Sequence, residues 1–308
     1  MSGMSTNLSV FTPGGRTGFL LIHGMSGTPV ELRYIANGLA REGYTVSCPQ
    51  LPGHCGTLEE LRRTTWHDWL GGVERALVEL EKHCDHVIVG GLSMGAVLVL
   101  KVAARNRHIV RGTVLFAPTL WLDGWGVPAH ARLFVLVRHQ WCADLFQFSE
   151  RPPYGIKDTR LRKLIADALA SGDPSKAGFL SIPGGLLLQL RWLVNSVKRD
   201  LGGITQPALL IHPREDDRAS MRNPNYLARH LGGRVDTVIL EDSYHIVTLD
   251  RQRDVVLART LSFAKSAMAG LADTDTAMGQ SRSEARGSGS SEARGERQQG
   301  QGRPFAAA

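Results

Sequence analysis

Several features of specialised proteins are missing from this 308-residue sequence. Its four cysteines, Cys48, Cys55, Cys84 and Cys142, are too few and too dispersed for a disulfide framework. They form no CxxC pair and no cysteine–histidine cluster with zinc spacing, so we expect free thiols and no metal site. No apolar run approaches the length of a membrane span, so no integral membrane segment is expected.

The sequence also lacks a concentrated basic segment, although its 36 Lys and Arg outnumber its 29 Asp and Glu, a formal net charge of +7. The positive charge is scattered and is not interleaved with aromatic residues, so no nucleic acid is expected among the partners. The first residues show no basic and apolar regions of a secretory signal, which favours a cytoplasmic protein. No pattern in the sequence indicates an oligomeric state.

The composition changes at about Leu271. Residues 283–287 and 291–295 both read Ser-Glu-Ala-Arg-Gly, within a stretch rich in Gly, Ser, Gln and Arg. Such a segment cannot bury enough apolar surface to offset the chain entropy that folding would cost. The sequence therefore predicts a disordered low-complexity tail over residues 271–308.

Strand-length apolar runs alternate with amphipathic stretches through the rest of the chain. The runs that predict strands are residues 18–23, 45–48, 86–90, 112–116, 208–212 and 236–240. Most of them are nearly continuous Val, Ile and Leu, which is typical of parallel strands covered on both faces. The stretches that predict helices are residues 30–42, 65–83, 94–106 and 223–231. The alternation predicts an α/β fold with a doubly wound, mostly parallel sheet.

One interval of about 90 residues, between the fourth and fifth of these strands, is far longer than a crossover helix needs. It is rich in aromatic residues and has helical patterns near 130–140, 158–170 and 185–199. We predict a helical insertion that shares a core with the main domain. The expected domains are 1–117 and 207–270 for the two parts of the α/β core, with 118–206 as the insertion.

The sharpest motif is Gly91-Leu-Ser-Met-Gly, placed directly between a predicted strand and an apolar predicted helix. In that context Gly-x-Ser-x-Gly is typical of a nucleophile elbow, a turn so tight that its flanking positions must lack side chains. A serine hydroxyl is a poor nucleophile near neutral pH and needs a base, with a third group to orient the base. Ser93 is therefore the predicted nucleophile.

Histidine positions suggest the base. His245 follows the last predicted strand and precedes the last helical stretch, so we expect it at the carboxyl edge of the sheet. Loops at that edge bind ligands in open α/β sheets, and His245 is the predicted base. His23 and His54 lie in a loop after a strand and in a Pro-Gly-His turn, and we interpret them as structural residues that hold loops.

The acid is expected in Pro213-Arg-Glu-Asp-Asp-Arg, which follows the strand before His245. An acid there gives the chain order serine, acid, histidine of α/β-hydrolases. Asp216 and Asp217 are adjacent, so their side chains should diverge, and the residues alone do not choose between them. Glu215 is a weaker candidate, and Asp242 is too close in sequence to the histidine to be favoured.

A negatively charged oxygen that develops during attack needs two hydrogen-bond donors. One expected donor is the backbone N–H of Met94, the residue after the serine, at the start of a helix. The other is expected in the loop His23-Gly-Met-Ser-Gly, where Gly24 allows close approach of the backbone. We predict that this second donor is the N–H of Met25.

Motifs along the chain also carry a resemblance. They are His23-Gly-Met-Ser-Gly-Thr-Pro, Gly43-Tyr-Thr-Val, Leu51-Pro-Gly-His, Trp66-His-Asp-Trp, Gly91-Leu-Ser-Met-Gly and Ser243-Tyr-His-Ile-Val-Thr-Leu-Asp. In this order and spacing, over about residues 15–265, they resemble the bacterial carboxylesterases and monoacylglycerol lipases of the α/β-hydrolase fold.

The resemblance implies Ser93 as nucleophile, His245 as base and Asp216 as acid. It also implies an oxyanion hole from the amides of Met25 and Met94, and a small helical cap at the insertion. Met25 stands where these esterases often carry Phe, and the cap segment is longer and richer in Trp than expected. The substrate range of the family therefore does not carry over.

The predicted function is a serine hydrolase that cleaves short to medium acyl esters or monoacylglycerols through an acyl-enzyme, without a cofactor. The expected partner is thus a small-molecule ester or lipid. Aromatic residues of the insertion favour an apolar acyl pocket, although packing of the insertion on the sheet explains them equally well. The same residues would serve a thioesterase, lactonase, amidase or acyltransferase. A non-catalytic binding protein of this fold is the other alternative, and it would need none of the three reactive side chains.

Overall fold

The computed structural model describes residues 7–179 and 181–269. The chain divides into a compact unit that ends at Ala264 and a second unit, Lys265–Ala308, of which residues 265–269 are described and are helical. The tail predicted for residues 271–308 lies outside the described residues.

The described part of the compact unit is built on a seven-stranded sheet with the strand order β1-β3-β2-β4-β5-β8-β9. These strands are β1 (Val10–Thr12), β2 (Thr17–Ile22), β3 (Thr45–Cys48), β4 (His86–Leu92), β5 (Val110–Phe116), β8 (Ala208–Pro213) and β9 (Val235–Leu240). Strand β1 is antiparallel to β3, and every other neighbouring pair in the sheet is parallel. The predicted mostly parallel, doubly wound α/β sheet is confirmed.

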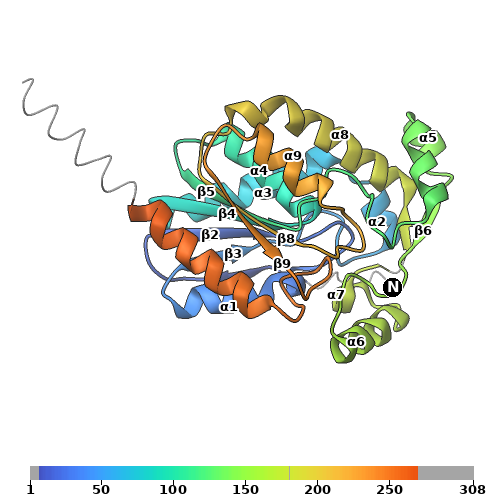
Figure 1. Cartoon of the computed structure of the whole chain (residues 1–308), viewed down its shortest axis with the longest axis horizontal. Coiled ribbons are helices and arrows are strands. Elements are labelled where there is room, and N and C mark those ends of the chain that lie inside the picture. Colours follow the sequence, from blue (N-terminus) through green and yellow to red (C-terminus); the bar gives the residue numbers. More distant parts are fainter. Residues whose placement is uncertain (1–6, 180, 270–308) are drawn as a thin grey trace, which may run out of the picture. The chain divides into compact units, whose positions relative to one another are not determined.

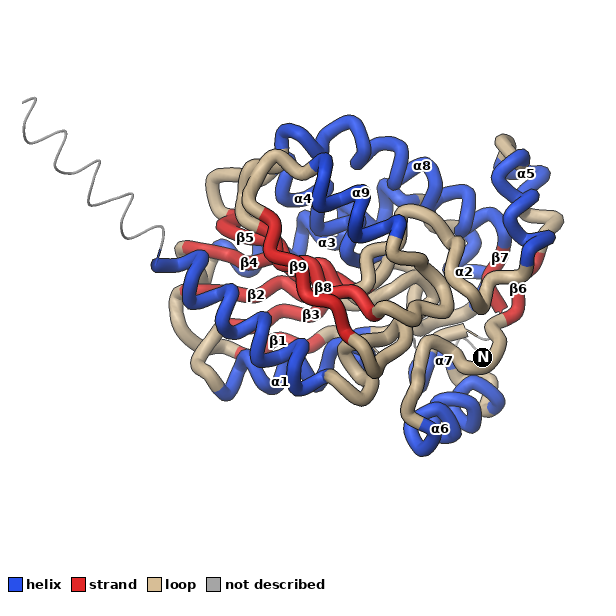
Figure 2. The backbone as a smooth tube through the Cα atoms, viewed as in Figure 1, coloured by secondary structure: helices blue, strands red, loops and turns tan. Residues whose placement is uncertain are grey.

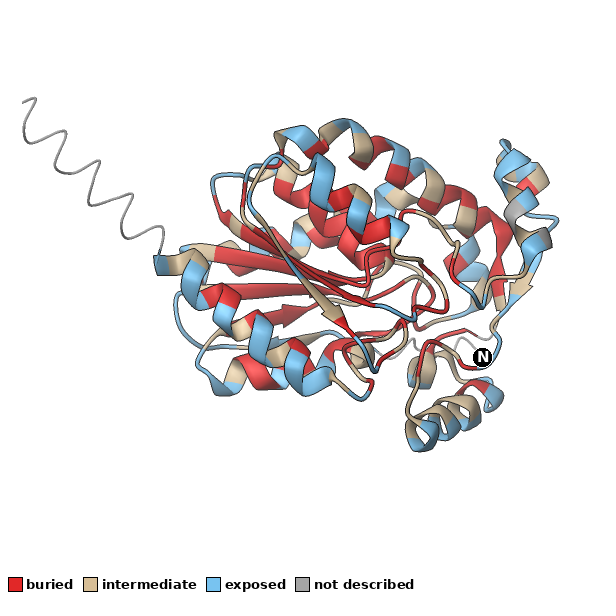
Figure 3. Cartoon of the chain, in the orientation of Figure 1, coloured by how far each residue is buried: buried red, intermediate tan, exposed pale blue. Residues whose placement is uncertain are grey.

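Helices cover both faces of this sheet (Figures 1 and 2). One face carries α1 (Arg33–Arg41), preceded by η1 (Pro29–Leu32), together with a helix that begins at residue 253. The other face carries α3 (Trp66–Glu81), α4 (Met94–Arg105), α8 (Gly184–Asp200) and α9 (Arg222–His230), while α2 (Leu58–Arg62) precedes α3. Figure 3 shows the buried residues concentrated in the strands and on the inner sides of these helices.

Helix α3 illustrates how the sequence determines these elements. The Thr65 hydroxyl accepts the N–H of Asp68, and the Asp68 carboxylate accepts the N–H of Thr65, a capping box that satisfies both groups. The buried side chains of α3 are Trp69, Leu70, Val73, Leu77 and Leu80. Their spacing places them on one face of the helix, and burial of each such side chain contributes about 1.5–3 kcal/mol.

The chain between β5 and β8 forms a separate group of elements. They are η2 (Ala129–Leu136), α5 (Gln140–Ala143), β6 (Gln147–Ser149), α6 (Thr159–Ala170), α7 (Pro174–Ala177), β7 (Ser181–Pro183), α8 and η3 (Leu201–Gly203). In Figure 1, α5, α6, α7 and β6 lie at one end of the sheet. Side chains of β7 and α8, including Ile182, Leu186, Leu190 and Val194, belong to the same hydrophobic core as α4.

The helical stretch predicted near residues 130–140 is present as two short helices. The structure has the 3₁₀ helix η2 and the one-turn helix α5 there, because the Arg191 guanidinium of α8 binds the backbone carbonyls of Phe134, Val135 and Val137. Those carbonyls are thereby satisfied without a continuing helix, and Val137 is extended (ψ 120°).

Three short strands also differ from the sequence-based expectation. The edge strand β1 was not expected, and neither was the antiparallel pair β6 and β7 inside a segment predicted as helical. Each of the three has three residues, too few for an alternating pattern to be recognised.

Candidate active site

Loops after several parallel strands meet at one edge of the sheet. The ends of the strands are in register, with Leu92 of β4 opposite Phe116 of β5, and Phe116 opposite Ile211 of β8. The N–H of Ser93 donates to the carbonyl of Phe116 at 2.9 Å. The residues that follow β4, β5, β8 and β9 therefore start from a common edge, as expected for the ligand-binding side of such a sheet.

Ser93 occupies a strained turn between β4 and α4. Its φ of 56° and ψ of −115° lie outside the conformations that a residue with a side chain readily adopts. A Cβ on Gly91 would lie 2.3 Å from the backbone of Gly95, and one on Gly95 would lie 2.2 Å from the carbonyl oxygen of Ile22. Both glycines are required by this close packing, which presents Ser93 at the N-terminus of α4.

The structure brings Ser93, His245 and Asp216 together. The hydroxyl of Ser93 lies 2.9 Å from Nε2 of His245, and Nδ1 of the same ring lies 2.8 Å from Oδ2 and 3.0 Å from Oδ1 of Asp216. His245 and Asp216 are each 3% exposed. Three residues separated by 152 and 29 positions in the sequence thus form one continuous set of contacts at the carboxyl edge.

Asp216 is held in its ionised form. Burial opposes ionisation, but the charges of His245 and His212 and hydrogen bonds from His245 and the Ala219 N–H outweigh it, and the pKa of Asp216 lies below its usual value. An ionised carboxylate on Nδ1 favours the tautomer that carries its proton on Nδ1. Nε2 is then free to accept the proton of the Ser93 hydroxyl.

The other three carboxyl groups that the sequence offers as candidate acids do not contact the ring of His245. Oδ2 of Asp217 accepts the backbone N–H of Gly155 at 3.0 Å, and its Oδ1 is 3.4 Å from the backbone nitrogen of His245, not from the ring. Burial raises the pKa of Asp217. Glu215 and Asp242 form ion pairs with the ammonium of Lys157, at 2.7 and 3.2 Å.

The loop that follows β2 passes beside Ser93. A Cβ on Gly24 would lie 3.7 Å from the Cβ of Ser93, an ordinary contact distance, so this loop packs directly against the serine. In the part of the chain that the structure describes, the N–H of Met25 has no hydrogen-bond acceptor. The N–H of Met94 belongs to the first turn of α4, where the helix itself offers no acceptor.

Two buried histidines hold this loop. Nε2 of His23 accepts the N–H of Leu51 at 3.1 Å, and its Nδ1 donates to the carbonyl of Gly24 at 2.9 Å. Nε2 of His54 accepts the N–H of Ser26 at 3.3 Å, and its Nδ1 donates to the carbonyl of Pro52. Burial lowers the pKa of His23 to about 3 and that of His54 to about 4, so both rings are neutral near pH 7.

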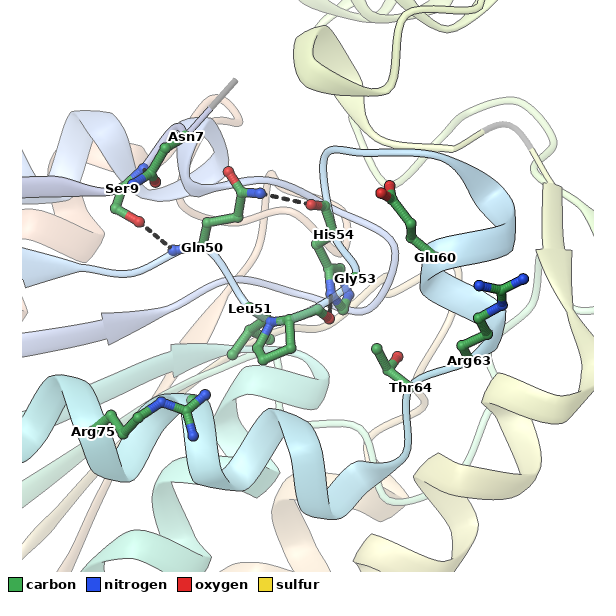
Figure 4. A pocket seen from close by; sticks show the side chains of 12 residues that line it. Asn7, Ser9, Gln50, Leu51, Gly53, His54, Glu60, Arg63, Thr64 and Arg75 are labelled. Atoms are coloured by element: carbon green, nitrogen blue, oxygen red, sulfur yellow. Dashed lines mark hydrogen bonds between the residues drawn. The ribbon is translucent and has the colours of Figure 1, made fainter. Parts of the chain in front are cut away.

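A polar pocket of about 540 Å³ lies next to the second of these histidines, on the side shown in Figure 4. The side chain of Gln50 donates to the carbonyl of His54 at 2.7 Å there, and Ser9 accepts the N–H of Gln50. Neither Ser93 nor His245 lines this pocket.

Two further residues at the site were not expected from the sequence. Oε2 of Glu31, in η1, accepts the N–H of Gly24 at 3.0 Å, and burial raises the pKa of this carboxyl to about 7. The hydroxyl of Thr119 lies 3.1 Å from that of Ser93. Glu31 could not be predicted because an acidic residue in the first turn of a helix is usually explained by its interaction with the helix dipole. Thr119 could not be predicted because a single Thr after a strand belongs to no motif.

Residues 7–179 and 181–269 contain neither a cluster of metal ligands nor a membrane-spanning helix. In these ranges no group of three or more His, Cys, Asp or Glu side chains is arranged to hold a metal ion. No helix there combines the length and the apolar character that crossing a bilayer requires. All four cysteines are free thiols.

Comparisons with known proteins agree with the architecture. Residues 19–259 match the model of the alpha/beta hydrolase family. The thermostable monoacylglycerol lipase of Bacillus sp. (strain H-257) is 30% identical over 254 residues, which cover 82% of this chain and 92% of that protein. The carboxylesterase of Bacillus subtilis (strain 168) is 25% identical over 250 residues, 79% of this chain and 90% of that protein.

Solved structures show the same likeness. A structure reported with the metagenome-derived lipolytic enzymes LipS and LipT has a TM-score of 0.72 and 26% identity, covering 84% of this chain and 97% of that chain. The monoacylglycerol lipase of Paleococcus ferrophilus has a TM-score of 0.71 at 16% identity, covering 85% and 99%, and shows a likeness of fold alone. From its sequence match, its sheet and these relatives, the chain belongs to the alpha/beta hydrolase family.

Proposed function

We propose that this protein is a serine hydrolase that cleaves carboxylic esters through an acyl-enzyme on Ser93. The observation that carries this proposal is the set of contacts from the Ser93 hydroxyl through both ring nitrogens of His245 to Asp216, at 2.9 and 2.8 Å. The names of two relatives, monoacylglycerol lipase and carboxylesterase, support the reaction class.

Acylation follows from the roles of these three side chains. Nε2 of His245 takes the hydroxyl proton while Oγ of Ser93 attacks the ester carbonyl carbon, and Asp216 stabilises the imidazolium that forms. The backbone N–H groups of Met25 and Met94 stabilise the negative oxygen of the tetrahedral intermediate, aided by the positive end of α4. His245 then gives its proton to the leaving alcohol oxygen, which leaves the acyl group on Ser93.

Deacylation repeats the sequence with water. His245 removes a proton from a water molecule, the oxygen of which attacks the acyl carbon, and the proton passes to Oγ as the bond to Ser93 breaks. A carboxylic acid is released and the free serine is restored. The Thr119 hydroxyl donates to the carbonyl of Ala117 at 3.2 Å and lies 3.1 Å from the hydroxyl of Ser93, so it is placed to restrict the rotamer of Ser93.

Short to medium acyl esters or monoacylglycerols are the proposed substrates. Support comes from a cavity of about 910 Å³ with a largely aromatic and aliphatic wall, most of it contributed by the insertion. Its lining includes Trp121, Phe134 and Phe148 from the segment between β5 and β8. In this proposal residues 118–206 form a cap over the α/β core.

The test combines covalent labelling with turnover. A fluorophosphonate probe should label the purified chain, and Ser93→Ala should abolish labelling and lower kcat by about 10⁶, whereas the exposed Ser171→Ala should change neither. An unlabelled wild-type protein would indicate a binding protein instead of an enzyme. A p-nitrophenyl acyl series tests the pocket, since equal rates at every chain length would contradict an apolar acyl site.

A further inference from the structure

Two stretches of the lining of the large cavity directly follow, in the chain, residues that contact Ser93 or His245, while Ser93 and His245 themselves do not line it. Leu120 and Trp121, which line it, directly follow Thr119, whose hydroxyl contacts Ser93. Asp217 and Arg218 also line it and directly follow Asp216. An acyl chain that left Ser93 past Thr119 would enter this space.

Basic side chains interrupt the apolar wall of the cavity, among them those of Arg151, Arg191 and Arg218. Arg218 is already neutralised by Glu150 through two hydrogen bonds of 2.7 and 2.6 Å. Arg191 is occupied by the backbone carbonyls at the end of η2. Lys198 of α8 and Arg222 of α9 also line the cavity, and neither forms an ion pair with a carboxylate in the described residues.

Lys198 and Arg222 meet at one indole. The Nζ of Lys198 lies 4.0 Å from the ring centroid of Trp121, and the guanidinium carbon of Arg222 lies 4.0 Å from the same centroid. The ring of Tyr226 is 5.2 Å from the Lys198 nitrogen. Cation–π contacts hold both charges in place without neutralising them.

The positive charges of Lys198 and Arg222 repel each other, and a bound anion would reduce that repulsion. Burial lowers the pKa of the half-buried Lys198, and the nearby charge of the exposed Arg222 lowers it further through this repulsion. Asp123, another carboxylate of the lining, accepts the N–H of Ser220 and the amide of Asn223 and is not paired with either cation. A ligand carboxylate beside the Trp121 ring would be attracted by both charges, and a guanidinium can bind two of its oxygens at once.

We propose that the cavity binds an acyl chain that ends in a carboxylate, with the carboxylate held by Lys198 and Arg222 beside Trp121. The preferred substrates would then be monoesters of dicarboxylic acids. This inference rests on the ester hydrolysis proposed for Ser93. The apolar wall accommodates the methylene chain, while the two cations select its charged end.

The experiment compares charged and neutral esters of equal length. Substrates are the mono-p-nitrophenyl esters of suberic and sebacic acid, against p-nitrophenyl octanoate and decanoate. The test variant is Lys198→Gln/Arg222→Gln. The matched control is Arg199→Gln/Arg229→Gln, which removes two charges from the same two helices at exposed positions outside the cavity.

The test variant should raise KM for the charged esters by about tenfold or more, because hydrogen bonds to charged groups are lost. It should leave kcat and the KM for the neutral esters within about twofold, since neither residue touches the reacting atoms. The control variant should behave as wild type, and added salt should weaken the preference for charged esters. Equal changes for charged and neutral esters, or the same change in the control, would overturn the anion site.

A binding measurement separates this inference from the reaction itself. If wild-type protein hydrolyses neither class of ester, the proposed function fails, but Ser93→Ala protein can still be titrated with monomethyl sebacate by calorimetry. Binding that is lost in the Lys198→Gln/Arg222→Gln background would support the site. No binding by the parent Ser93→Ala protein would refute it.

Discussion

Replacing Asp216 by Asn should lower kcat by about 10⁴, whereas Asp217→Asn should lower it by less than about tenfold. The two residues are neighbours in sequence and both are buried, so the pair is its own control. Their hydrogen bonds explain the difference. Asp216 contacts the ring of His245, and Asp217 contacts only backbone nitrogens, those of Gly155 and His245.

The large loss of kcat expected for Asp216→Asn follows from the backbone contacts of Asp216. Its Oδ1 accepts the N–H groups of Arg218 at 2.7 Å and Ala219 at 2.8 Å. An Asn would keep those bonds with its amide oxygen and turn its NH₂ toward Nδ1 of His245, which must then be unprotonated. Nε2 would carry the proton and could not accept one from Ser93. A loss of about 10⁴ corresponds to roughly 5.4 kcal/mol in the barrier.

At Asp217 the substitution removes much less. An Asn still accepts the N–H of Gly155 through its amide oxygen, and the 3.4 Å contact to the His245 nitrogen is weak. Burial already disfavours the charge of Asp217, so a neutral amide suits the place.

The assay is kcat on a neutral p-nitrophenyl ester, with thermal melting to show that both variants are folded. A larger loss in Asp217→Asn than in Asp216→Asn, with both proteins folded, would refute the reasoning from hydrogen bonds. Equal losses would do the same, because only Asp216 contacts the ring.

Other predictions concern the turn and the loop around the serine. Gly95→Ala should destabilise the protein by about 1–3 kcal/mol or more in urea unfolding, because the new methyl meets the backbone of β2, whereas Gly202→Ala, with open space around it, should be near neutral. Burial raises the pKa of Glu31 from 4.5 to about 7, so the contribution of Glu31 to the free energy of unfolding should fall as pH rises from about 4.5 to 7, opposite in sign to that of His23 and His54. Glu31→Gln keeps an acceptor for Gly24 and should make the free energy of unfolding rise more steeply with pH over that range than in wild type, and parallel pH dependences in the two proteins would contradict the shift. Thr119→Val should lower kcat about two- to tenfold with KM unchanged, because the contact between the Thr119 and Ser93 hydroxyls is lost. A kcat equal to that of wild type would show that this contact does not contribute to catalysis.

The long strands and helices could be predicted because their residues leave little choice. Strand β4 is almost entirely buried, and a continuous apolar run such as His86–Leu92 fits a strand covered on both faces. The division of the segment at residues 130–140 into two short helices could not be predicted, because the end of η2 depends on Arg191, more than fifty positions away in sequence. The hydrophobic pattern of residues 130–140 does not indicate their contact with Arg191.

The site shows the same division between local and distant causes. Ser93 could be predicted from local sequence because the closely packed turn around it requires glycine at Gly91 and Gly95. The choice between Asp216 and Asp217 needs the position of His245, which the sequence near residue 216 does not contain. The role of Glu31 could not be predicted for a similar reason, since the N–H that it accepts belongs to Gly24, in the loop after β2.

The neutral rings of His23 and His54 set an acid limit for this protein. In an unfolded chain each would take up a proton near pH 6.5, but in the folded protein they do so only at about 3 and about 4. The stability that depends on them is complete above pH 6.5 and declines as the pH falls toward those two values. Acidification should therefore release the backbone segment beside Ser93 by unfolding the protein.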